Sequence, residues 1–516
     1  MCHDNAISIM HSDSSRGACP KHLPPHRLSI LAQHPTQPTV LAAESMYPRK
    51  KRRVDLSNRL RVSEVLKQTK MNKQRSPINC LPTQLLALIL DHVIHTHYRS
   101  HNSYYIDSWW NLKKELARVS PHWNNVILNS PMLWSTIRVS EWNAPFIQTC
   151  LERSQGVPLN IEVEGGDVYR TRLSAPLDAV MRFAHRWRSL RVTNVYIGSL
   201  AGREELLGDY VVKKINHLNF PLLRCVVISE FRIFPRFLLP AHSPALEHLQ
   251  LRKHPAWPDF SLAHTLKTLH LDFGQDLPQN RSFLNPVPTQ ALTTLSLSGE
   301  VGGRLEPQSI HFPYLNKLAV FDVNAIRRFL VAIIAPNLER FIYSAGDGEL
   351  PSVVFAGLGS KFSNVHHLSL SGGSFLDRDR NGAVYLSRAF PGVQHMEVRH
   401  RHNLRLIIPR RWHRHRSVYR VDVWKQLDTL TLRNMVHAKP EDLKCLLGWT
   451  MRRKRTSFDP LHLTIYCPGK PYDDARLFER YFDVMKESCI TVLHSPAVRP
   501  IVYAGLDLPP TVVSAS

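Results

Sequence analysis

Three pairs of histidines separated by one residue are the strongest candidates for metal chemistry in this sequence: His95 and His97, His400 and His402, and His413 and His415. In a strand, two side chains at this spacing point to the same face and could share a metal ion. The neighbouring sequence does not supply the cysteine and acidic partners that complete a typical site. We therefore expect neither a bound metal nor another cofactor.

Motifs for nucleophilic or nucleotide chemistry are absent from the sequence. Neither G-x-x-x-x-G-K-[ST] nor G-x-S-x-G occurs, and Gly357-Leu358-Gly359 lacks the third glycine of a dinucleotide-binding loop. We expect a protein that is not an enzyme. A hydrolytic or metal enzyme is the weakest alternative, since it would need a concave pocket where histidines and carboxylates converge.

Composition indicates a reduced, basic protein of the nucleus or cytoplasm. The chain has 516 residues, eight cysteines without a C-x-x-C pair, a net charge of +24 and a pI near 9.9. Length predicts two or more domains. No apolar run reaches the ~18 residues of a membrane span, and the residues after Met1 lack the order of a secretory signal. The positive charge permits attraction to nucleic acid or acidic partners.

Basic residues concentrate in residues 1–77, 399–416 and 452–455. The first of these segments is also rich in Ser, Pro and His, so we predict that it is disordered. Within it, Arg49, Lys50, Lys51, Arg52 and Arg53 resemble a nuclear import signal that an import receptor would bind, the alternative being a solvated charge run. The 399–416 cluster could contact phosphates, although an exposed loop is the expected interpretation.

An apolar helix is predicted from Leu81 to Val93. Pro82 suits its first turn, and the turns that follow are apolar on nearly all sides. Such a short helix must be covered on two sides, of which its own neighbours can cover one. We predict a loop over residues 95–110, a second helix from about Leu112 to Val119, and a third that Ser120-Pro121 begins. The alternative for this region is a helical cap on the domain that follows.

The rest of the chain repeats the pattern Φ-x-x-Φ-x-Φ, where Φ is apolar, at intervals of about 20 to 34 residues. A proline stands two residues before the first anchor in several copies, where it favours an extended path. This pattern is typical of a leucine-rich-repeat solenoid with short parallel strands. The copies begin at Trp187, Leu223, Leu246, Leu266, Leu292, Leu315, Leu338, Val365, Val393 and Leu427.

The helical region resembles the F-box in Leu81-Pro82-x-x-Leu85-Leu86-x-x-Ile89, Val119-x-x-x-Trp123 and Pro131-x-Leu133-Trp134. The stretch from Cys150 to Ile161 is similar to the one that follows the F-box in many fungal F-box proteins with leucine-rich repeats. The resemblance implies a substrate receptor of a ubiquitin ligase, in which a Skp-family adaptor and a cullin bind through the F-box and a protein substrate, destined for the proteasome, binds the repeats. It implies adaptor contacts for Leu81, Pro82, Leu85 and Ile89, with Val119, Trp123 and Trp134 shaping or completing that surface.

In each repeat, the residues beside the later anchors should line the concave strand face. This face is polar and mildly basic, and it could suit an acidic or phosphorylated segment, although a merely solvated sheet face is the alternative. The candidate substrate contacts are His248, Gln250, Arg252, His270, Lys317, Arg340, His367, His395 and Glu397.

We therefore predict an α/β protein: a short helical F-box followed by a leucine-rich-repeat-like solenoid with a parallel β-sheet on its concave face. The alternative function is a basic repeat scaffold that binds RNA or chromatin without ligase activity. The predicted parts are a disordered basic region (1–77), an F-box-like domain (78–137), a linker or N-terminal cap (138–186), the solenoid (187–468), a C-terminal cap containing an amphipathic helix at 473–487 (469–507) and a tail (508–516).

Overall fold

The structure is a computed structural model, in which the chain divides into two compact units, residues 1–76 and 77–516. Within the described residues, no helix combines the length and the apolar character needed to cross a membrane. The described residues are 63–64, 77–100, 108–140, 144–165, 170–194, 206–252, 264–273, 287–300, 305–345, 349–372, 379, 381–408, 423–433, 435, 440–456, 459–466, 481, 484–486 and 489–494.

Three α-helices open the second unit: α2 (Thr83–Ser100), α3 (Ser108–Val119) and α4 (Pro121–Asn129), preceded by the 3-10 turn η1 (Pro77–Cys80). The predicted start of the third helix is confirmed, because the Ser120 hydroxyl accepts a hydrogen bond from the Trp123 N–H at 3.2 Å and Pro121 occupies the first turn. The predicted loop over 95–110 is wrong at both ends. Helix α2 continues to Ser100, since Ile94 extends its buried stripe by one turn, and α3 begins at Ser108.

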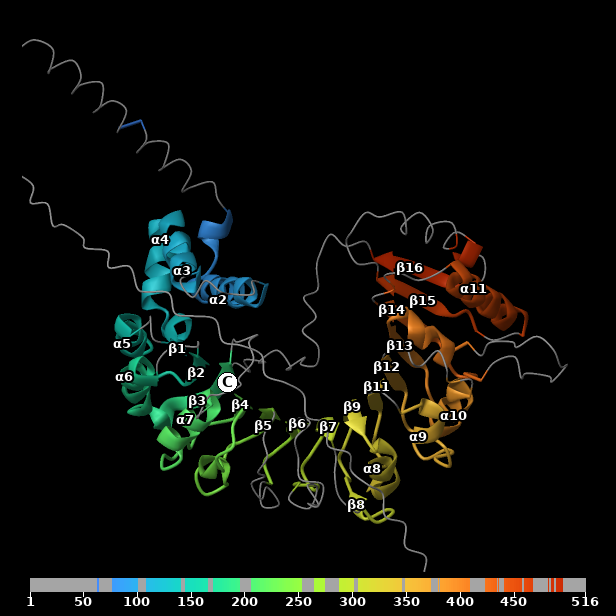
Figure 1. Ribbon diagram of the computed structural model, residues 1–516. Helices are drawn as coiled ribbons and strands as arrows, with labels where there is room; N and C mark the ends of the chain where they lie inside the picture. The colour runs from blue at the N-terminus through green and yellow to red at the C-terminus, as the bar shows by residue number, and fades with distance from the viewer. Residues whose placement is uncertain are drawn as a thin grey trace, which may run out of the picture. The chain divides into compact units, whose positions relative to one another are not determined.

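One parallel sheet of 14 strands dominates the described residues, and its strands follow one another in chain order (Figure 1). The short β8 (Ile310–His311) and β10 (Ile333–Ile334) form a separate parallel pair. The strands of the large sheet are β1 (Thr136–Val139), β2 (Leu159–Gly165), β3 (Trp187–Asn194), β4 (Cys225–Ser229), β5 (His248–Arg252), β6 (Thr268–Asp272), β7 (Thr294–Glu300), β9 (Lys317–Asn324), β11 (Arg340–Ala345), β12 (His367–Gly372), β13 (His395–Arg399), β14 (Thr429–Arg433), β15 (His462–Tyr466) and β16 (Ile490–His494).

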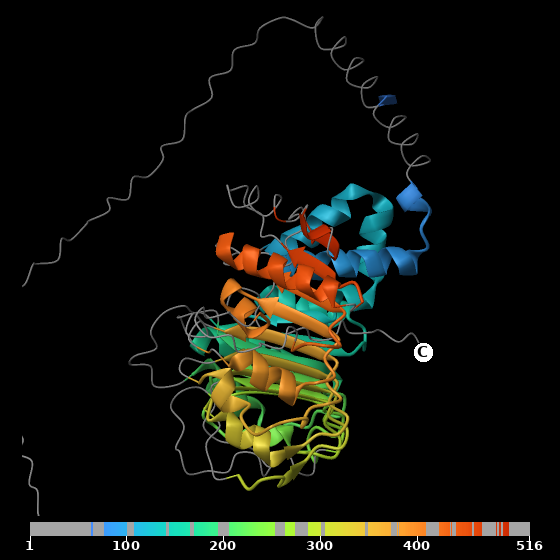
Figure 2. The same ribbon diagram turned by 90° about the vertical axis from the view of Figure 1, so that its right-hand side faces the viewer.

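The connections between strands carry the other helices. Figure 1 shows α8, α9 and α10 beside strands β9 to β13, and Figure 2 gives the view turned by 90°. The 3-10 turn η2 (Pro131–Trp134) precedes β1, and the connecting elements are α5 (Ala144–Arg153), α6 (Arg170–Met181), η3 (Ala184–Arg186), α7 (Leu207–Ile215), η4 (Arg236–Leu238), α8 (Ile326–Ala332), α9 (Pro351–Val354), α10 (Gly382–Ala389), η6 (Arg401–Leu406) and α11 (Pro440–Arg455).

The apolar anchors of successive repeats stack in register to form the core. Leu249 pairs with Leu269, which pairs with Leu295, and all three are buried. On β11 the anchor Phe341 packs against Phe362 and Phe390 from the connections that follow, at ring-centroid distances of 5.8 and 4.9 Å. The anchors of a strand are thus buried against those of neighbouring strands and against the connections that follow.

Polar side chains link neighbouring repeats at the predicted proline positions. The Asn337 amide donates to the Pro313 carbonyl, and the Asn364 amide donates to the Pro336 carbonyl, both at 2.7 Å. These bonds satisfy carbonyl groups that the connections leave unpaired, so the amide of one repeat fixes the turn of the repeat before it.

The predicted α/β class with a large parallel sheet is confirmed. The sheet begins earlier than the predicted repeats, because β1 and β2 pair with each other and β2 pairs with β3. At the other end, β16 pairs with β15 within the segment predicted as a cap. Much of the amphipathic helix predicted at 473–487 lies outside the described residues, and helix is found at residues 481 and 484–486. The basic run at 49–53, the tail at 508–516 and most of the disorder predicted for 1–77 also lie outside them.

Candidate docking surfaces

Helix α2 presents two apolar faces with opposite environments. Leu86, Leu90 and Ile94, four residues apart, are at most 2% exposed and pack into the core. Leu85 and Ile89, on the adjacent stripe, are 49% and 41% exposed, although their side chains are as apolar as the buried ones. The helix therefore keeps one stripe for its own core and leaves a second stripe at the surface.

Other apolar side chains of the helical region are exposed as well. Val119, at the end of α3, is 59% exposed. Leu81 and Trp123 are half-buried against the core, and Pro82 is exposed. The further exposed apolar residues are Leu88, Val93, Leu128 and Met132. Sequence reasoning did not select these four, since apolar character alone does not distinguish the exposed stripe from the buried one.

Trp134 is placed differently from the other predicted adaptor contacts. Its side chain is 1% exposed, and its indole N–H donates to the Ile127 carbonyl at 2.7 Å. Its ring lies 6.2 Å from those of Trp110 and Phe146. Trp134 therefore ties the three helices to the first strand, and its part in shaping or completing the adaptor surface stays a prediction.

Two cations flank the Trp134 ring in this junction. The Lys113 ammonium lies 4.7 Å and the Arg153 guanidinium 4.6 Å from the ring centroid. Lys113 also donates a hydrogen bond to the Leu133 carbonyl. Burial lowers the pKa of Lys113 to about 7, with the nearby Arg138 acting in the same direction and Cys150 and Asp91 opposing it. Burial likewise raises the pKa of the Cys150 thiol to about 12.

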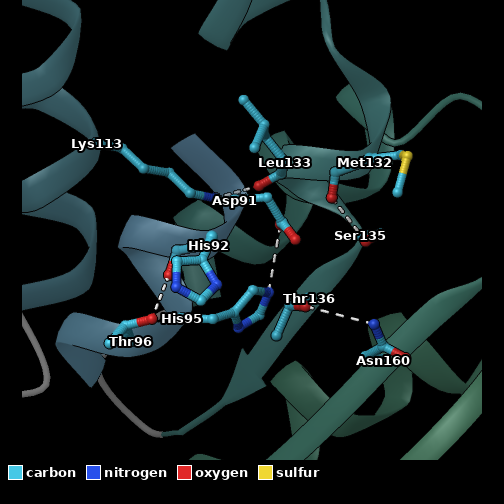
Figure 3. A network of polar contacts seen from close by, with 10 residues as sticks. All are labelled: Asp91, His92, His95, Thr96, Lys113, Met132, Leu133, Ser135, Thr136 and Asn160. Atoms are coloured by element: carbon cyan, nitrogen blue, oxygen red, sulfur yellow. Dashed lines mark hydrogen bonds and ion pairs between the residues drawn. The ribbon is translucent and has the colours of Figure 1, made fainter. Parts of the chain in front are cut away.

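A polar seam continues from this junction along α2 and into the sheet (Figure 3). The His95 ring lies 3.3 Å from the Asp91 carboxylate one helical turn away. On the strand side, the Asn160 amide of β2 donates to the Thr136 hydroxyl of β1 at 3.5 Å. The first of these pairs lies within α2 and the second joins β1 to β2.

The residues predicted to contact a substrate occupy registered rows on the sheet. Lys317, Arg340, His367 and His395 are directly paired on β9, β11, β12 and β13. They alternate with buried anchors, so they lie on the face opposite to the apolar core. The sheet therefore brings together side chains that are widely separated in the sequence.

A second group of predicted contacts gathers on β5 and β6. The Gln250 amide, with its oxygen toward Arg252, accepts hydrogen bonds from Nη2 and Nε at 2.8 and 2.6 Å, and Gln250 is buried. Burial, together with Lys317, Arg252 and His248, lowers the pKa of His270 to about 4. This part of the face is tightly packed, which leaves Gln250 little surface for a partner.

Glu397 is engaged within the sheet. Its carboxylate oxygen lies 2.9 Å from Nε of both Arg399 and Arg433. The Arg433 guanidinium also covers the Tyr466 ring, at 4.1 Å from its centroid. Sequence reasoning missed Arg399, Arg433 and Tyr466 as members of this face, although their position after the last anchor of each strand could have indicated it.

No family model matches the chain, and no curated protein matches it either. Among the described residues, no group of three or more His, Cys, Asp or Glu side chains is placed to hold a metal ion. The pair His413 and His415 lies outside the described residues, as does much of the basic cluster at 399–416. The candidate sites therefore rest on the exposed stripe of α2 and on the polar face of the sheet.

Proposed function

We propose that this chain is the substrate-recognition subunit of a Skp/cullin/F-box ubiquitin ligase. In this proposal, residues 78–137 form an F-box that binds a Skp-family adaptor. The repeats form a leucine-rich-repeat-like solenoid whose polar sheet face holds a protein substrate. The chain itself carries out no catalysis, because a ligase of this type acts by raising the effective concentration of the substrate near a conjugating enzyme.

The exposed apolar stripe of α2 carries the proposal. Leu85 and Ile89 lie one helical turn apart and are nearly half exposed, while Leu86 and Leu90 beside them are buried. A contiguous apolar surface of this kind marks a protein-binding site on a folded domain. Burial of Leu85, Leu88 and Ile89 in a hydrophobic groove of the adaptor would contribute about 1 kcal/mol or more each to the free energy of binding.

The junction around Trp134 supports the proposal that the chain holds its substrate at a fixed position relative to the adaptor. Trp110 of α3 and Phe146 of α5 pack together at a ring-centroid distance of 4.7 Å. Lys113 of α3 bonds to the Leu133 carbonyl just before β1. These contacts hold the three helices firmly on the first strands. A rigid link of this kind would keep a bound substrate at a fixed position relative to the adaptor.

The adaptor contact is tested with purified components. We would measure binding of a recombinant Skp-family adaptor to the full chain and to a variant carrying Leu85→Asp and Ile89→Asp. We expect at least a tenfold loss of affinity, because burying two carboxylates in an apolar interface costs more than the ~1.4 kcal/mol that a factor of ten represents. Leu222→Asp, at another apolar side chain that is 45% exposed, is the matched control and should bind normally. Equal binding by all three proteins would count decisively against this docking surface.

The cations of the sheet face and the net charge of +24 favour a second candidate, a scaffold that binds RNA or chromatin. Phosphate contacts of that kind weaken steeply as salt rises. Titration of an RNA oligonucleotide at increasing salt distinguishes the two functions, since adaptor binding through an apolar stripe changes little with salt. Absent or salt-insensitive RNA binding would eliminate the scaffold function.

A further inference from the structure

The row formed by Lys317, Arg340, His367 and His395 differs from the rest of the sheet face in its charge. These four side chains stand on four consecutive strands in direct register. The His367 and His395 rings stack with centroids 4.5 Å apart and planes 18° from parallel. Arg340 is exposed and the other three are half-buried, so all four remain accessible on this face.

The positions beside the row in register carry one carboxylate, that of Glu397. Glu397 lies on the same face of β13, but its carboxylate is engaged by Arg399 and Arg433. The next row in register, at the positions between the anchors, consists of Ala319, Ile342, Ser369 and Glu397. Ala319, Ile342 and Ser369 are small or apolar, so Glu397 is the one carboxylate of this neighbouring row.

We propose that this row binds an extended acidic peptide segment that crosses the strands, and that His367 couples this binding to pH. The proposal rests on the function proposed above in taking the peptide as part of a substrate. Strands in a sheet lie ~4.8 Å apart, so the row spans about 14 Å. Alternate side chains of an extended peptide lie ~6.7 Å apart, so three alternating carboxylates span about the same distance.

Charge argues for this occupant over others. The chain itself carries a net charge of +24 and its segment 1–77 is rich in Lys and Arg, so its own N-terminal region does not complement the row. Proteins that bind single-stranded nucleic acid without sequence preference use aromatic rings on which bases stack. The row and the row beside it in register contain no such ring besides the two histidines, which are already stacked on each other. The guanidinium, ammonium and imidazole groups of the row suit the side-chain carboxylates of an acidic peptide better than they suit the bases of a nucleic acid.

The surroundings of His367 give the sign of the pH dependence. Burial, the neighbouring His395, Arg340 and His366 lower the pKa of His367, and Glu339 acts in the opposite direction. A carboxylate above the row stabilises the protonated ring, so binding takes up a proton. Affinity should therefore rise as pH falls from 7.5 to 5.5, a range in which the glutamates of a peptide stay largely ionised.

The experiment uses the full-length protein and two fluorescein-labelled nine-residue peptides, in which serine alternates with glutamate or with glutamine. Fluorescence anisotropy is measured from pH 5.5 to 7.5 at constant ionic strength. We expect binding of the glutamate peptide alone, strengthening several-fold toward pH 5.5. Arg340→Ala should weaken it about tenfold, the effect of losing one charge-assisted contact. His367→Gln should abolish the pH dependence.

Matched controls lie on exposed residues away from the row. Arg328→Ala on α8 and His311→Gln on β8 should bind the glutamate peptide like the wild type. The Leu85→Asp, Ile89→Asp variant should also bind it, so failure of adaptor binding and failure of this proposal are separate results. Three outcomes would overturn the proposal: no binding of the glutamate peptide, equal binding of both peptides, or unchanged binding by the row variants. Tighter binding of an oligouridylate that the same variants weaken would replace the peptide with a nucleic acid.

Discussion

The ammonium group of Lys113 lies 4.7 Å from the centroid of the Trp134 ring and donates a hydrogen bond to the carbonyl of the preceding residue, Leu133. Lys113 is 2% exposed and Trp134 is 1% exposed. The pair stands where the helical region meets the first strand, so it links the two proposed binding surfaces. A cation in this position makes the stability of the junction depend on pH.

The free energy of unfolding should therefore change with pH. Burial lowers the pKa of Lys113 from 10.5 to about 7 in the folded chain. Between these values the unfolded chain binds more protons, so stability rises with pH, by up to ~1.4 kcal/mol per pH unit. We predict that urea denaturation from pH 7 to 8.5 shows this rise in the wild type and a flatter profile in Lys113→Met. The exposed Lys425→Met is the control and should keep the wild-type slope. An equal slope in Lys113→Met would assign the pH dependence to other groups.

Neighbouring residues of α2 should respond to substitution in opposite ways. Leu90→Ala removes a buried side chain, so we predict a loss of about 2–5 kcal/mol in the free energy of unfolding. Ile89→Asp changes a side chain that is 41% exposed, so we predict a small effect on stability but loss of adaptor binding. Thermal unfolding and adaptor titration of both variants check this. A large destabilisation by Ile89→Asp would place Ile89 in the core of the chain instead of in an interface.

Close packing between repeats should make Gly392 irreplaceable. A Cβ atom at Gly392 would lie 2.2 Å from the Ser363 carbonyl oxygen, whereas one at Gly359 would meet nothing within 4 Å. Since the Ser363 contact is with backbone, the turns that precede β12 and β13 would have to shift. We predict that Gly392→Ala costs about 1–3 kcal/mol and that Gly359→Ala changes stability by less than about 0.5 kcal/mol. Equal melting temperatures for the two variants would contradict the close approach.

A buried guanidinium supports the turn after α5. The Arg186 Nη2 donates to the Ser154 hydroxyl at 2.9 Å and to the Val157 carbonyl at 2.8 Å. Arg186→Met leaves these acceptors without their donor, so we predict a loss of about 2 kcal/mol in the free energy of unfolding. The exposed Arg182→Met, four residues earlier, should have little effect, and urea denaturation of both variants measures the difference.

Much of the fold was predictable because its signals are local. The repeated apolar anchors indicated the strands of the large sheet from β3 to β14, and Ser120-Pro121 indicated the start of α4. The strands β1 and β2 were not predicted as members of the sheet, because two or three alternating apolar residues do not distinguish a strand from a linker. The end of α2 was missed for a similar reason, since the residues after Ile94 are mostly polar and do not continue the apolar period.

The candidate sites were also predictable only in part from the sequence. The sequence by itself determined the apolar character of α2, the alternation that puts His367 and His395 on the polar side of their strands, and the excess of positive charge. Only the tertiary structure decided that Leu86 is buried while Leu85 is exposed, that Trp134 lies in the core, and that four basic side chains from four strands form one row. The physical reason is that periodicity fixes which side chains share a face, whereas exposure and registered neighbours depend on the packing of segments far apart in the chain.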